Sequence, residues 1–462
     1  MKTYPMIAVV MVVIGALLAL DYFKPSILLR NTECDTIDSL RVYRFVIQGE
    51  PHETQHCYRY ETEERVLVYI PRDSVRVYPQ ASDTIITRTR IRRGGRIGDF
   101  NYGLYLRRQG IIGTAYAWRY MLRPCAERRE ISVPLQKRLY HRLSESGLEG
   151  DELATTGALT LGYKEDLDPD LRRRFQASGA AHVLAVSGLH TGIIYTLLMG
   201  LLTLGGRVRP RYEDQWGRVI LGSVIIVVMW GYAWITGMTP SVVRCVVMVS
   251  MVEIGKMVYR NSLTLNTIAA SAVLILLVSP LDLWSISFQL SFAATTSIVL
   301  IANDLEQVMP FASQGHTFWR KAIRYILGMI VVSLAAQIGT APITMFTFGQ
   351  MSNYFLLTNL LVLPIASCLV PCGLACIALG GSGVGIIFGK ITYGLAWMMN
   401  HAVGWIESLP GSSCNVSITG WMVILLYGAI GMGWMAVHKS LWWLIGVASA
   451  VIGFCTAYII LY

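Results

Sequence analysis

The sequence predicts a polytopic, all-helical membrane bundle of about ten core spans, with one N-terminal anchor and one small β domain outside the lipid. Of its 462 residues, 54% are hydrophobic and 15% are charged, whereas soluble domains carry about 25% charged residues. Residues 219–462 contain eight Lys or Arg and five Asp or Glu, while residues 22–150 contain 22 and 15. An ordinary soluble protein is therefore excluded, and the basic segment is expected to fold in water.

The N-terminus predicts a membrane anchor over residues 1–21. Its apolar run, residues 4–20, is near the lower limit for crossing a hydrocarbon core about 30 Å thick. The run ends without a small-x-small cleavage site, so we interpret it as a retained anchor with a cytoplasmic N-terminus. The next domain is then exported, and its Cys34 and Cys57 are candidates for a disulfide. Two unrelated thiols are the alternative, because Cys125 is also available.

The exported domain, residues 22–134, is expected to consist of short strands. The pattern places them at residues 41–47, 65–70, 74–78 and 84–91, and the last of these alternates as Thr-Ile-Ile-Thr-Arg-Thr-Arg-Ile. Short strands separated by prolines and glycines are typical of a small β-barrel of the oligonucleotide/oligosaccharide-binding (OB) kind. We therefore expect an OB-like domain here.

An arginine-rich segment of this domain is a candidate ligand site. Residues 84–123 contain nine arginines and a single acidic residue. Guanidinium groups match phosphate oxygens, and nearby aromatic residues offer flat faces for bases, as in single-strand nucleic-acid binding. A solvated basic face and a patch on anionic lipid head groups are the alternatives. The candidate nucleic-acid-binding residues are Arg88, Arg90, Arg92, Arg93, Arg96, Arg107 and Arg108.

The remaining chain predicts an amphipathic, interfacial connector at residues 135–181 and a polytopic domain at residues 182–462. Spans are expected at residues 182–204, 219–236, 241–258, 263–279, 282–302, 323–348, 354–380, 383–404, 418–437 and 441–462. Loops after odd-numbered spans contain Lys or Arg, apart from the short loop after the seventh, whereas loops after even-numbered spans contain none. The positive-inside rule therefore has the chain enter the bundle from the outside, in agreement with the anchor.

Polar residues within these spans are candidates for function, because burying them in lipid costs free energy. For each one alone, a hydrogen bond that joins two helices is the commoner explanation. Together they favour an aqueous path between helices that are broken at Gly188, Pro342 and Pro364. The candidate channel residues are His182, Ser187, Gly188, His190, Arg244, Gln289, Ser291 and Asn359.

Signatures of catalysis are absent from the sequence. There is no Gly-x-x-x-x-Gly-Lys-Ser/Thr phosphate loop, no His-Glu-x-x-His metal motif and no Gly-x-Ser-x-Gly elbow around Ser187. We therefore expect no enzyme activity, metal or cofactor, and expect energy from nucleotide hydrolysis to come from another protein.

The most specific motif is Phe175-x-x-x-Gly-x-x-His-Val-Leu-Ala-Val-Ser-Gly-Leu-His190. Four others are Gly-Asp-Phe-Asn-Tyr-Gly-Leu-Tyr-Leu-Arg-Arg-Gln-Gly-Ile at 98–111, Thr-Gly-Met-Thr-Pro-Ser-Val-Val-Arg at 236–244, Ser-Pro at 279–280 with Phe-Gln-Leu-Ser-Phe at 288–292, and Asn-Leu-Leu-Val-Leu-Pro at 359–364. In this order they resemble the motifs of ComEC-type competence proteins, and the resemblance extends from about residue 98 to 364.

That resemblance implies a bacterial inner-membrane channel that passes one DNA strand inward during natural transformation, with the OB-like domain receiving single-stranded DNA in the periplasm. Membrane lipids, a DNA receptor outside and a helicase-like ATPase inside are the implied partners. Many family members continue into a metallo-β-lactamase-like domain, whereas this chain ends at Tyr462 and has no His-x-His-x-Asp-His. Nuclease activity is therefore not expected, and a separate nuclease is expected to degrade the other strand.

Two other functions remain open on the sequence. A transporter or flippase for an anionic lipid or polysaccharide precursor would share the bundle, and its soluble domain would bind that ligand rather than DNA. A non-catalytic assembly protein would use the buried polar residues for packing alone, and would tolerate apolar substitutions at Gln289 and Asn359.

Overall fold

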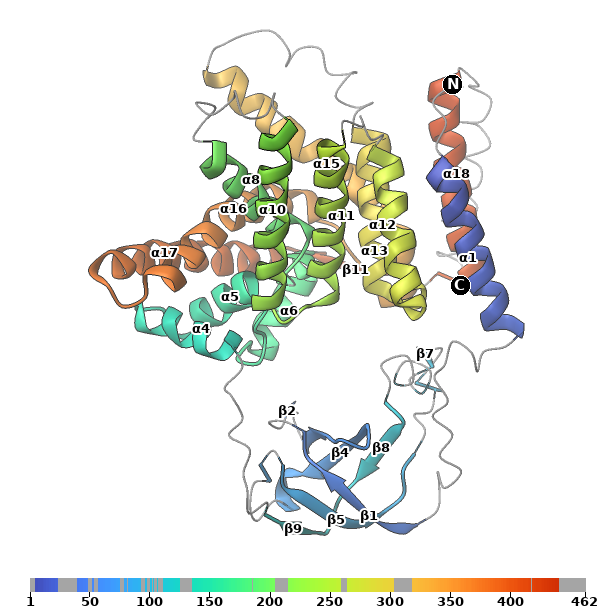
Figure 1. The fold of residues 1–462 in the computed structure, drawn as a ribbon, viewed down its shortest axis with the longest axis vertical. Helices are drawn as coiled ribbons and strands as arrows, with labels where there is room; N and C mark the ends of the chain where they lie inside the picture. The colour runs from blue at the N-terminus through green and yellow to red at the C-terminus, as the bar shows by residue number, and fades with distance from the viewer. Residues whose placement is uncertain are drawn as a thin grey trace. The chain divides into compact units, whose positions relative to one another are not determined.

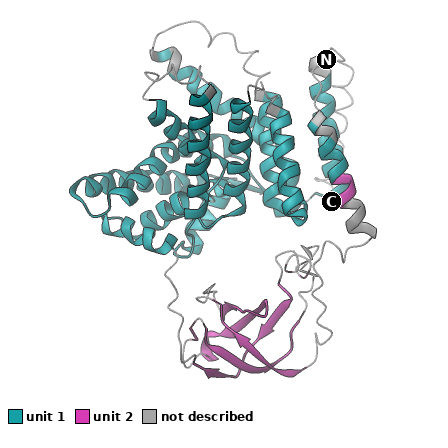
Figure 2. Cartoon of the chain, in the orientation of Figure 1, with its two compact units in different colours: residues 1–13, 135–462 teal, residues 14–134 magenta. Residues whose placement is uncertain are grey.

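The structure is a computed structural model that describes residues 5–23, 40–48, 52–53, 57–74, 79–80, 82–92, 96–97, 100–101, 103, 106, 111–124, 135–184, 186–203, 215–258, 264–302, 318–416 and 418–439. The chain forms two compact units, one of residues 1–13 with 135–462 and one of residues 14–134 (Figure 2). We call them the helical unit and the β unit. The fold is mostly helical with small N-terminal sheets, as the sequence predicts (Figure 1).

The helices follow the predicted spans closely in order and position. They are α1 (Pro5–Phe23), α4 (Leu135–Glu145), α5 (Gly150–Leu161), α6 (Pro169–Ala177), α7 (Ala181–Leu184), α8 (Gly188–Thr203), α10 (Gln215–Ile235), α11 (Pro240–Met257), α12 (Thr264–Val278), α13 (Ile286–Ser297), α15 (Phe318–Phe348), α16 (Phe355–Leu379), α17 (Gly383–Glu407) and α18 (Gly420–Lys439). Two short strands, β10 (Gln350–Ser352) and β11 (Ser413–Asn415), pair antiparallel. The last predicted span, residues 441–462, lies outside the described residues.

Three of the described helices are long and apolar enough to cross a membrane: Trp216–Ile235, Ala322–Phe348 and Phe355–Leu379. Four shorter apolar helices accompany them, Gly188–Thr203, Leu265–Val278, Ile286–Ile301 and Gly420–Met435. Helices α6 and α11 each begin with a proline, Pro169 and Pro240, in the first turn. Proline is favoured there because the N–H that it lacks would have no partner within the helix. The total of ten core spans stays a prediction.

The predicted breaks at two prolines are wrong. Helix α15 continues through Pro342, and α16 continues through Pro364 and Pro371. Neighbouring helices and small local adjustments can accommodate the backbone carbonyl that an internal proline leaves unbonded. The break near Gly188 is present, because α7 ends at Leu184 and α8 begins at Gly188. A further irregularity is the π-helical turn η4 (Ile298–Ala302), which follows α13.

Residues of the predicted connector lie in the core of the helical unit. Eight consecutive residues of α5, from Ala154 to Leu161, are buried, and α5 packs against α16 and α17. The Oγ1 of Thr155 donates a 2.9 Å hydrogen bond to the Oδ1 of Asn400 in α17. Leu171 and Phe175 of α6 join the same hydrophobic cluster as residues of α8, α10, α11 and α16. The first helices after the β unit therefore form part of the packed bundle.

Two small sheets make up most of the β unit. The first has the order β1 (Arg41–Val46), β5 (Thr84–Thr89), β9 (Tyr120–Arg123) and is antiparallel. The second has the order β2 (His52–Glu53), β3 (Cys57–Glu61), β4 (Val66–Pro71), β8 (Gly113–Tyr116), with β4 and β8 parallel. A separate pair is formed by β6 (Arg96–Ile97) and β7 (Phe100–Asn101).

Isolated bridges connect the two sheets. Ile47, just after β1, pairs antiparallel with Thr62, and Arg92, just after β5, pairs antiparallel with Thr114 of β8. Side chains from both sheets share one core, which includes Phe45, Tyr60, Val68, Ile85 and Ala115. The unit therefore has its own hydrophobic centre, enclosed by both sheets.

The β unit contains three of the predicted strands and several strands that the sequence did not predict. The predicted strands at 41–47, 65–70 and 84–91 correspond to β1, β4 and β5. Ser74 ends a short 3-10 helix, Arg72–Ser74, and residues 75–78 lie outside the described residues. Strands β3, β8 and β9 were not predicted, because their apolar and polar residues alternate over only four or five positions.

A glycine in α5 tests the packing of α4 and α5. A Cβ at Gly157 would lie 2.5 Å from the Cε2 atom of the Tyr140 ring. We expect Gly157→Ala to destabilise the helical unit by about 1–3 kcal/mol, the usual cost of overpacking. The measurement is thermal unfolding of the purified protein in detergent.

Gly394→Ala in α17 is the matched control, since no atom lies within 4 Å of a Cβ built there. Alanine is the better helix former, so this variant is expected to unfold at the same or a higher temperature. Equal melting temperatures for the two variants would contradict the close contact of Gly157 with Tyr140.

Candidate functional site

The first turns of three helices meet within the helical unit. Gly188 at the start of α8 faces α11, where a Cβ at Gly188 would lie 3.1 Å from the Sγ of Cys245. The hydroxyls of Ser241 in α11 and Ser287 in α13 are 3.1 Å apart. Residues within or directly next to the motifs at 175–190, 236–244 and 288–292 therefore contact one another in pairs, α8 with α11 and α11 with α13, although about 100 residues of sequence separate the first motif from the last.

Arg244 is the buried cation at this junction, with 2% of its surface exposed. Its Nη2 donates to the carbonyl oxygen of Ser287 at 3.0 Å, to the Oγ of Ser241 at 3.1 Å and to the Oγ of Ser287. Its Nε and Nη1 are buried and have no hydrogen-bond partner among the described residues. Asp282 attracts the guanidinium without forming an ion pair within 4.0 Å. A buried charge with unused donors is costly, so this arginine is well suited to an anionic ligand.

Ser187 and His190 contact each other. The backbone N–H of Ser187 donates to the Nδ1 of His190 at 3.1 Å, and the Ser187 Oγ lies 3.0 Å from the same nitrogen. A side chain that reaches back three residues in this way caps the start of a helix. Nδ1 is then an acceptor, and in the neutral ring the proton is on Nε2, which is buried without a partner among the described residues. His190 thus fixes the start of α8 and keeps one donor unused.

His182, another predicted channel residue, and the nearby Gly179 of the same motif have structural roles. The Nδ1 of the exposed His182 lies 3.1 Å from the carbonyl oxygen of Gly179. Gly179 has φ +88°, and a Cβ there would lie 2.8 Å from the Cβ of Ser352. Next to it, the Oγ1 of Thr358 in α16 donates to the carbonyl oxygen of Ser178 at 2.7 Å. The segment between α6 and α7 is therefore attached to the start of α16.

The remaining predicted channel residues do not join Arg244 through hydrogen bonds between described residues. Gln289 is half-buried, and its Nε2 donates to the carbonyl oxygen of Leu283 at 3.0 Å, which ties the first turn of α13 to the preceding segment. Ser291 is half-buried in the next turn. Asn359 lies in the first turns of α16, and its buried Oδ1 has no hydrogen-bond partner in the described part of the chain. Its unused acceptor is compatible with the predicted path.

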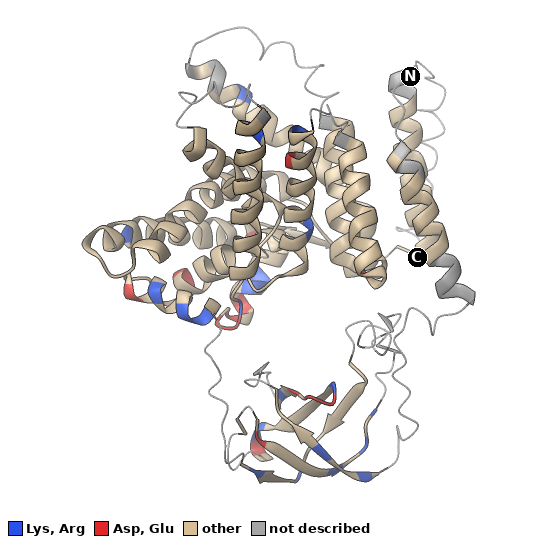
Figure 3. Cartoon of the chain, viewed as in Figure 1, with Lys and Arg blue, Asp and Glu red and all other residues tan. Residues whose placement is uncertain are grey.

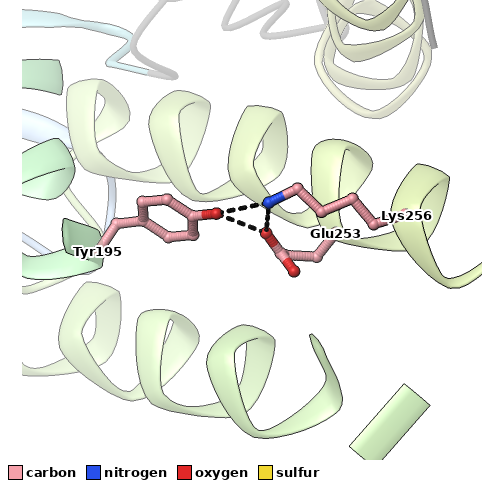
Figure 4. Close-up of polar contacts among 3 residues, drawn as sticks. All are labelled: Tyr195, Glu253 and Lys256. Atoms are coloured by element: carbon pink, nitrogen blue, oxygen red, sulfur yellow. Dashed lines mark hydrogen bonds and ion pairs between the residues drawn. The ribbon is translucent and has the colours of Figure 1, made fainter. Parts of the chain in front are cut away.

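Charged residues are rare in the described helices of the bundle's centre, with α12, α13 and α16 carrying none (Figure 3). One exception is a second polar cluster on α8 and α11. The hydroxyl of Tyr195 donates to the Oε1 of the buried Glu253 at 2.6 Å, and the Nζ of Lys256 lies 2.6 Å from that oxygen and 2.7 Å from the Tyr195 hydroxyl (Figure 4). The negative charge of Glu253 is therefore balanced by Lys256, more than two helical turns from Arg244.

The sequence did not indicate that Ser241 and Ser287 accept hydrogen bonds from Arg244, or that Tyr195 donates one to Glu253. The i, i+3 spacing of Glu253 and Lys256 is a signal for their ion pair. No sequence signal identifies Ser287 as the acceptor for Arg244, because the contact joins residues 43 positions apart.

The arginines of the β unit are only partly described. Arg88, Arg90 and Arg92 are exposed at alternate positions of β5 and its extension, on the side away from the core. Arg96 belongs to β6, but its side chain is outside the described part of the structure, as are Arg93, Arg107 and Arg108. Cys57 begins β3 and is half-buried, and Cys34 lies outside the described residues, so their disulfide stays a prediction.

Comparisons with known proteins agree with the motifs. ComE operon protein 3 of Bacillus subtilis (strain 168) is 27% identical over 328 residues, 70% of this chain and 38% of that protein. An uncharacterized protein of Aquifex aeolicus (strain VF5) is 28% identical over 259 residues, 56% of this chain and 54% of that protein. The uncharacterized protein YcaI of Escherichia coli (strain K12) is 24% identical over 283 residues, 58% of this chain and 36% of that protein.

The aligned parts thus span between 36% and 54% of these relatives' own lengths. No solved structure matches the chain significantly. The sequence model of the family described as "Competence protein" matches residues 159–442, which is more than half of the chain and includes the starts of α8, α11 and α13. This protein therefore belongs to the competence protein family.

Proposed function

We propose that the protein conducts single-stranded DNA across the bacterial inner membrane during natural transformation, with the β unit receiving the strand in the periplasm. Family membership supports a role in DNA uptake. Single-stranded DNA carries one negative charge per nucleotide and cannot enter hydrocarbon, so the helical unit has to offer it polar groups along the way.

The buried guanidinium of Arg244 carries this proposal. Two of its nitrogens have no partner among the described residues, and guanidinium donors fit phosphate oxygens. Arg244 lies in the second turn of α11 and contacts Ser287 at the start of α13. The predicted topology places this part of the helical unit near the outer end of the path. One guanidinium, with its charge partly offset by Asp282, would hold one phosphate at a time, and weak binding of this kind permits transit.

The strand order of the β unit supports an OB-type barrel. In chain order, β1, β3, β4, β5 and β8 are its five main strands, and their pairings and bridges give the circular order β1-β3-β4-β8-β5-β1. A five-stranded Greek-key barrel of this kind binds oligonucleotides partly through the connection between its fourth and fifth strands. Here that connection, residues 93–112, contains Arg93, Arg96, Arg107 and Arg108, which supports their proposed role.

Other proteins complete the proposed pathway. A DNA receptor would deliver the strand outside, and a helicase-like ATPase would pull it inward by binding the basic segments at Arg207 and Arg320 on the predicted cytoplasmic side. A separate nuclease would degrade the complementary strand. Cross-linking from these two segments in competent cells tests the ATPase contact.

Arg244→Met tests the contact within the helical unit. Replacing a buried charge by an apolar side chain of similar length is often neutral or stabilising for the fold, whereas a phosphate contact is lost. We expect entry of labelled DNA into cells to fall at least tenfold, with surface-bound DNA and the melting temperature of the purified protein maintained.

Lys390→Met is the control, because it removes one charge from an exposed position of α17. It is expected to leave DNA entry unchanged. Normal DNA entry in cells that carry Arg244→Met would rule out the proposed role of this side chain.

A triple substitution of Arg88, Arg90 and Arg92 by Gln tests the β unit. Each phosphate contact with single-stranded DNA contributes about 0.7 to the slope of log affinity against log salt. If all three arginines contact phosphates, the slope for the full-length protein in detergent is expected to fall by about 2 in magnitude. A triple Gln variant of the exposed Arg138, Arg142 and Arg173 in the helical unit serves as the charge-matched control, and equal slopes for the two variants would contradict the assignment.

A further inference from the structure

We propose that the outer side of β3, β4 and β8 is a base-stacking site for unpaired nucleotides, built from Arg59, Tyr69 and Tyr116. This inference rests on the proposed function and adds a distinction: the two tyrosines contact bases, while Arg59 and the arginines of β5 contact phosphates. Arg59 and Tyr69 lie outside the arginine-rich segment, residues 84–123, and Tyr116 lies within it but is not among the candidate binding residues that the sequence predicts.

Strand register places the three residues in one row. Arg59 of β3 is opposite Tyr69 of β4, and Tyr69 is opposite Tyr116 of β8. Residues paired in this way have neighbouring side chains on the same face of a sheet. Their neighbours along the strands, including Tyr60, Val68 and Ala115, are buried in the core. Alternation therefore directs Arg59, Tyr69 and Tyr116 away from the core.

The two tyrosines already form a stack. Their ring centroids are 5.2 Å apart and their planes differ by 20°. Tyr116 is 42% exposed, and Trp118, two residues further along the chain, is 69% exposed. Flat aromatic side chains at the surface of a β domain are the platforms on which bases of single-stranded nucleic acids stack, and this contact is tolerant of sequence. A nucleobase placed against Tyr116 would extend the existing pair of rings.

Arg59 supplies the charge at the end of this row. Among the residues that the structure describes, its buried Nε has no hydrogen-bond partner and its side chain forms no ion pair. A guanidinium beside an aromatic ring can bind a phosphate or stack on a base. The next outward residue of β3 is acidic, the exposed Glu61. The net charge of this surface is therefore small, so base stacking is expected to provide most of its affinity.

The first sheet differs in chemistry on its outer side. There Arg44, Arg88 and Arg123 are exposed, with no stacked pair of aromatic rings among the described residues beyond the core pair of Tyr43 and Phe45. That surface also exposes the aliphatic side chains of Val42 and Met121, and its arginines fit contacts to phosphates. A DNA strand that follows both sheets would meet phosphate contacts on one and base contacts on the other.

The test compares two fluorescent 15-mers of equal charge, oligo(dT) and an abasic backbone, with the full-length protein in nanodiscs. The wild-type protein is expected to bind oligo(dT) about tenfold more tightly, because the abasic strand cannot stack. Tyr116→Ala is expected to abolish this preference while leaving abasic binding unchanged. Tyr116→Phe keeps the ring and is expected to keep the preference. Arg59→Met is expected to weaken the binding of both strands.

Tyr325→Ala, at another exposed tyrosine in α15, is the matched control and should retain the wild-type preference. Equal binding of both strands by the wild-type protein, or a full preference in Tyr116→Ala, would overturn the stacking site while leaving the proposed function intact. Failure of the wild-type protein to bind either strand would count against both. Circular dichroism of each purified variant identifies any that fail to fold, and Tyr69→Ala then replaces such a variant.

Discussion

The central physical constraint in the helical unit is a positive charge held where little else is charged. Arg244 is almost fully buried, and one of its three nitrogens takes all the hydrogen bonds that serines of α11 and α13 provide. A structural arginine would normally have its donors satisfied, since unpaired buried donors cost about 1–3 kcal/mol each. The fold accepts this cost at the place where three helices begin, which is the arrangement expected of a site that an anion completes.

The other buried charge in α11 behaves differently. Glu253 has Lys256 and Tyr195 within hydrogen-bond distance of one carboxylate oxygen, so its charge is balanced within the protein. The contrast separates two roles for polar groups in an apolar bundle. The Glu253 cluster joins α8 to α11, whereas two nitrogens of Arg244 have no hydrogen-bond partner among the described residues and can still donate. His190 combines both features, because one ring nitrogen caps α8 and the other has no partner among the described residues.

In the β unit, the polar and aromatic side chains discussed above lie on the outer sides of the two sheets. Its core is apolar and shared by two sheets. The side chains that alternate outward are not needed for this core, so their chemistry can differ from one sheet to the other. Arginines occupy the outward positions of β5, and stacked tyrosines occupy those of β4 and β8. Under the proposed function, long-range attraction of a polyanion and short-range contact with its bases would take place on different faces of one small domain.

Composition and hydrophobic pattern alone determined that this chain is mostly helical and membrane-associated, with a separate β unit, and the motifs alone indicated the family. Those properties depend on local periodicity and on spacing, which are readable along the chain. Tertiary structure decided the rest. It placed Ser287 against Arg244, buried α5 in the bundle, carried α15 and α16 through their prolines and brought Arg59, Tyr69 and Tyr116 into one row. These outcomes depend on contacts between distant segments and on strand register, which no local pattern of residues contains.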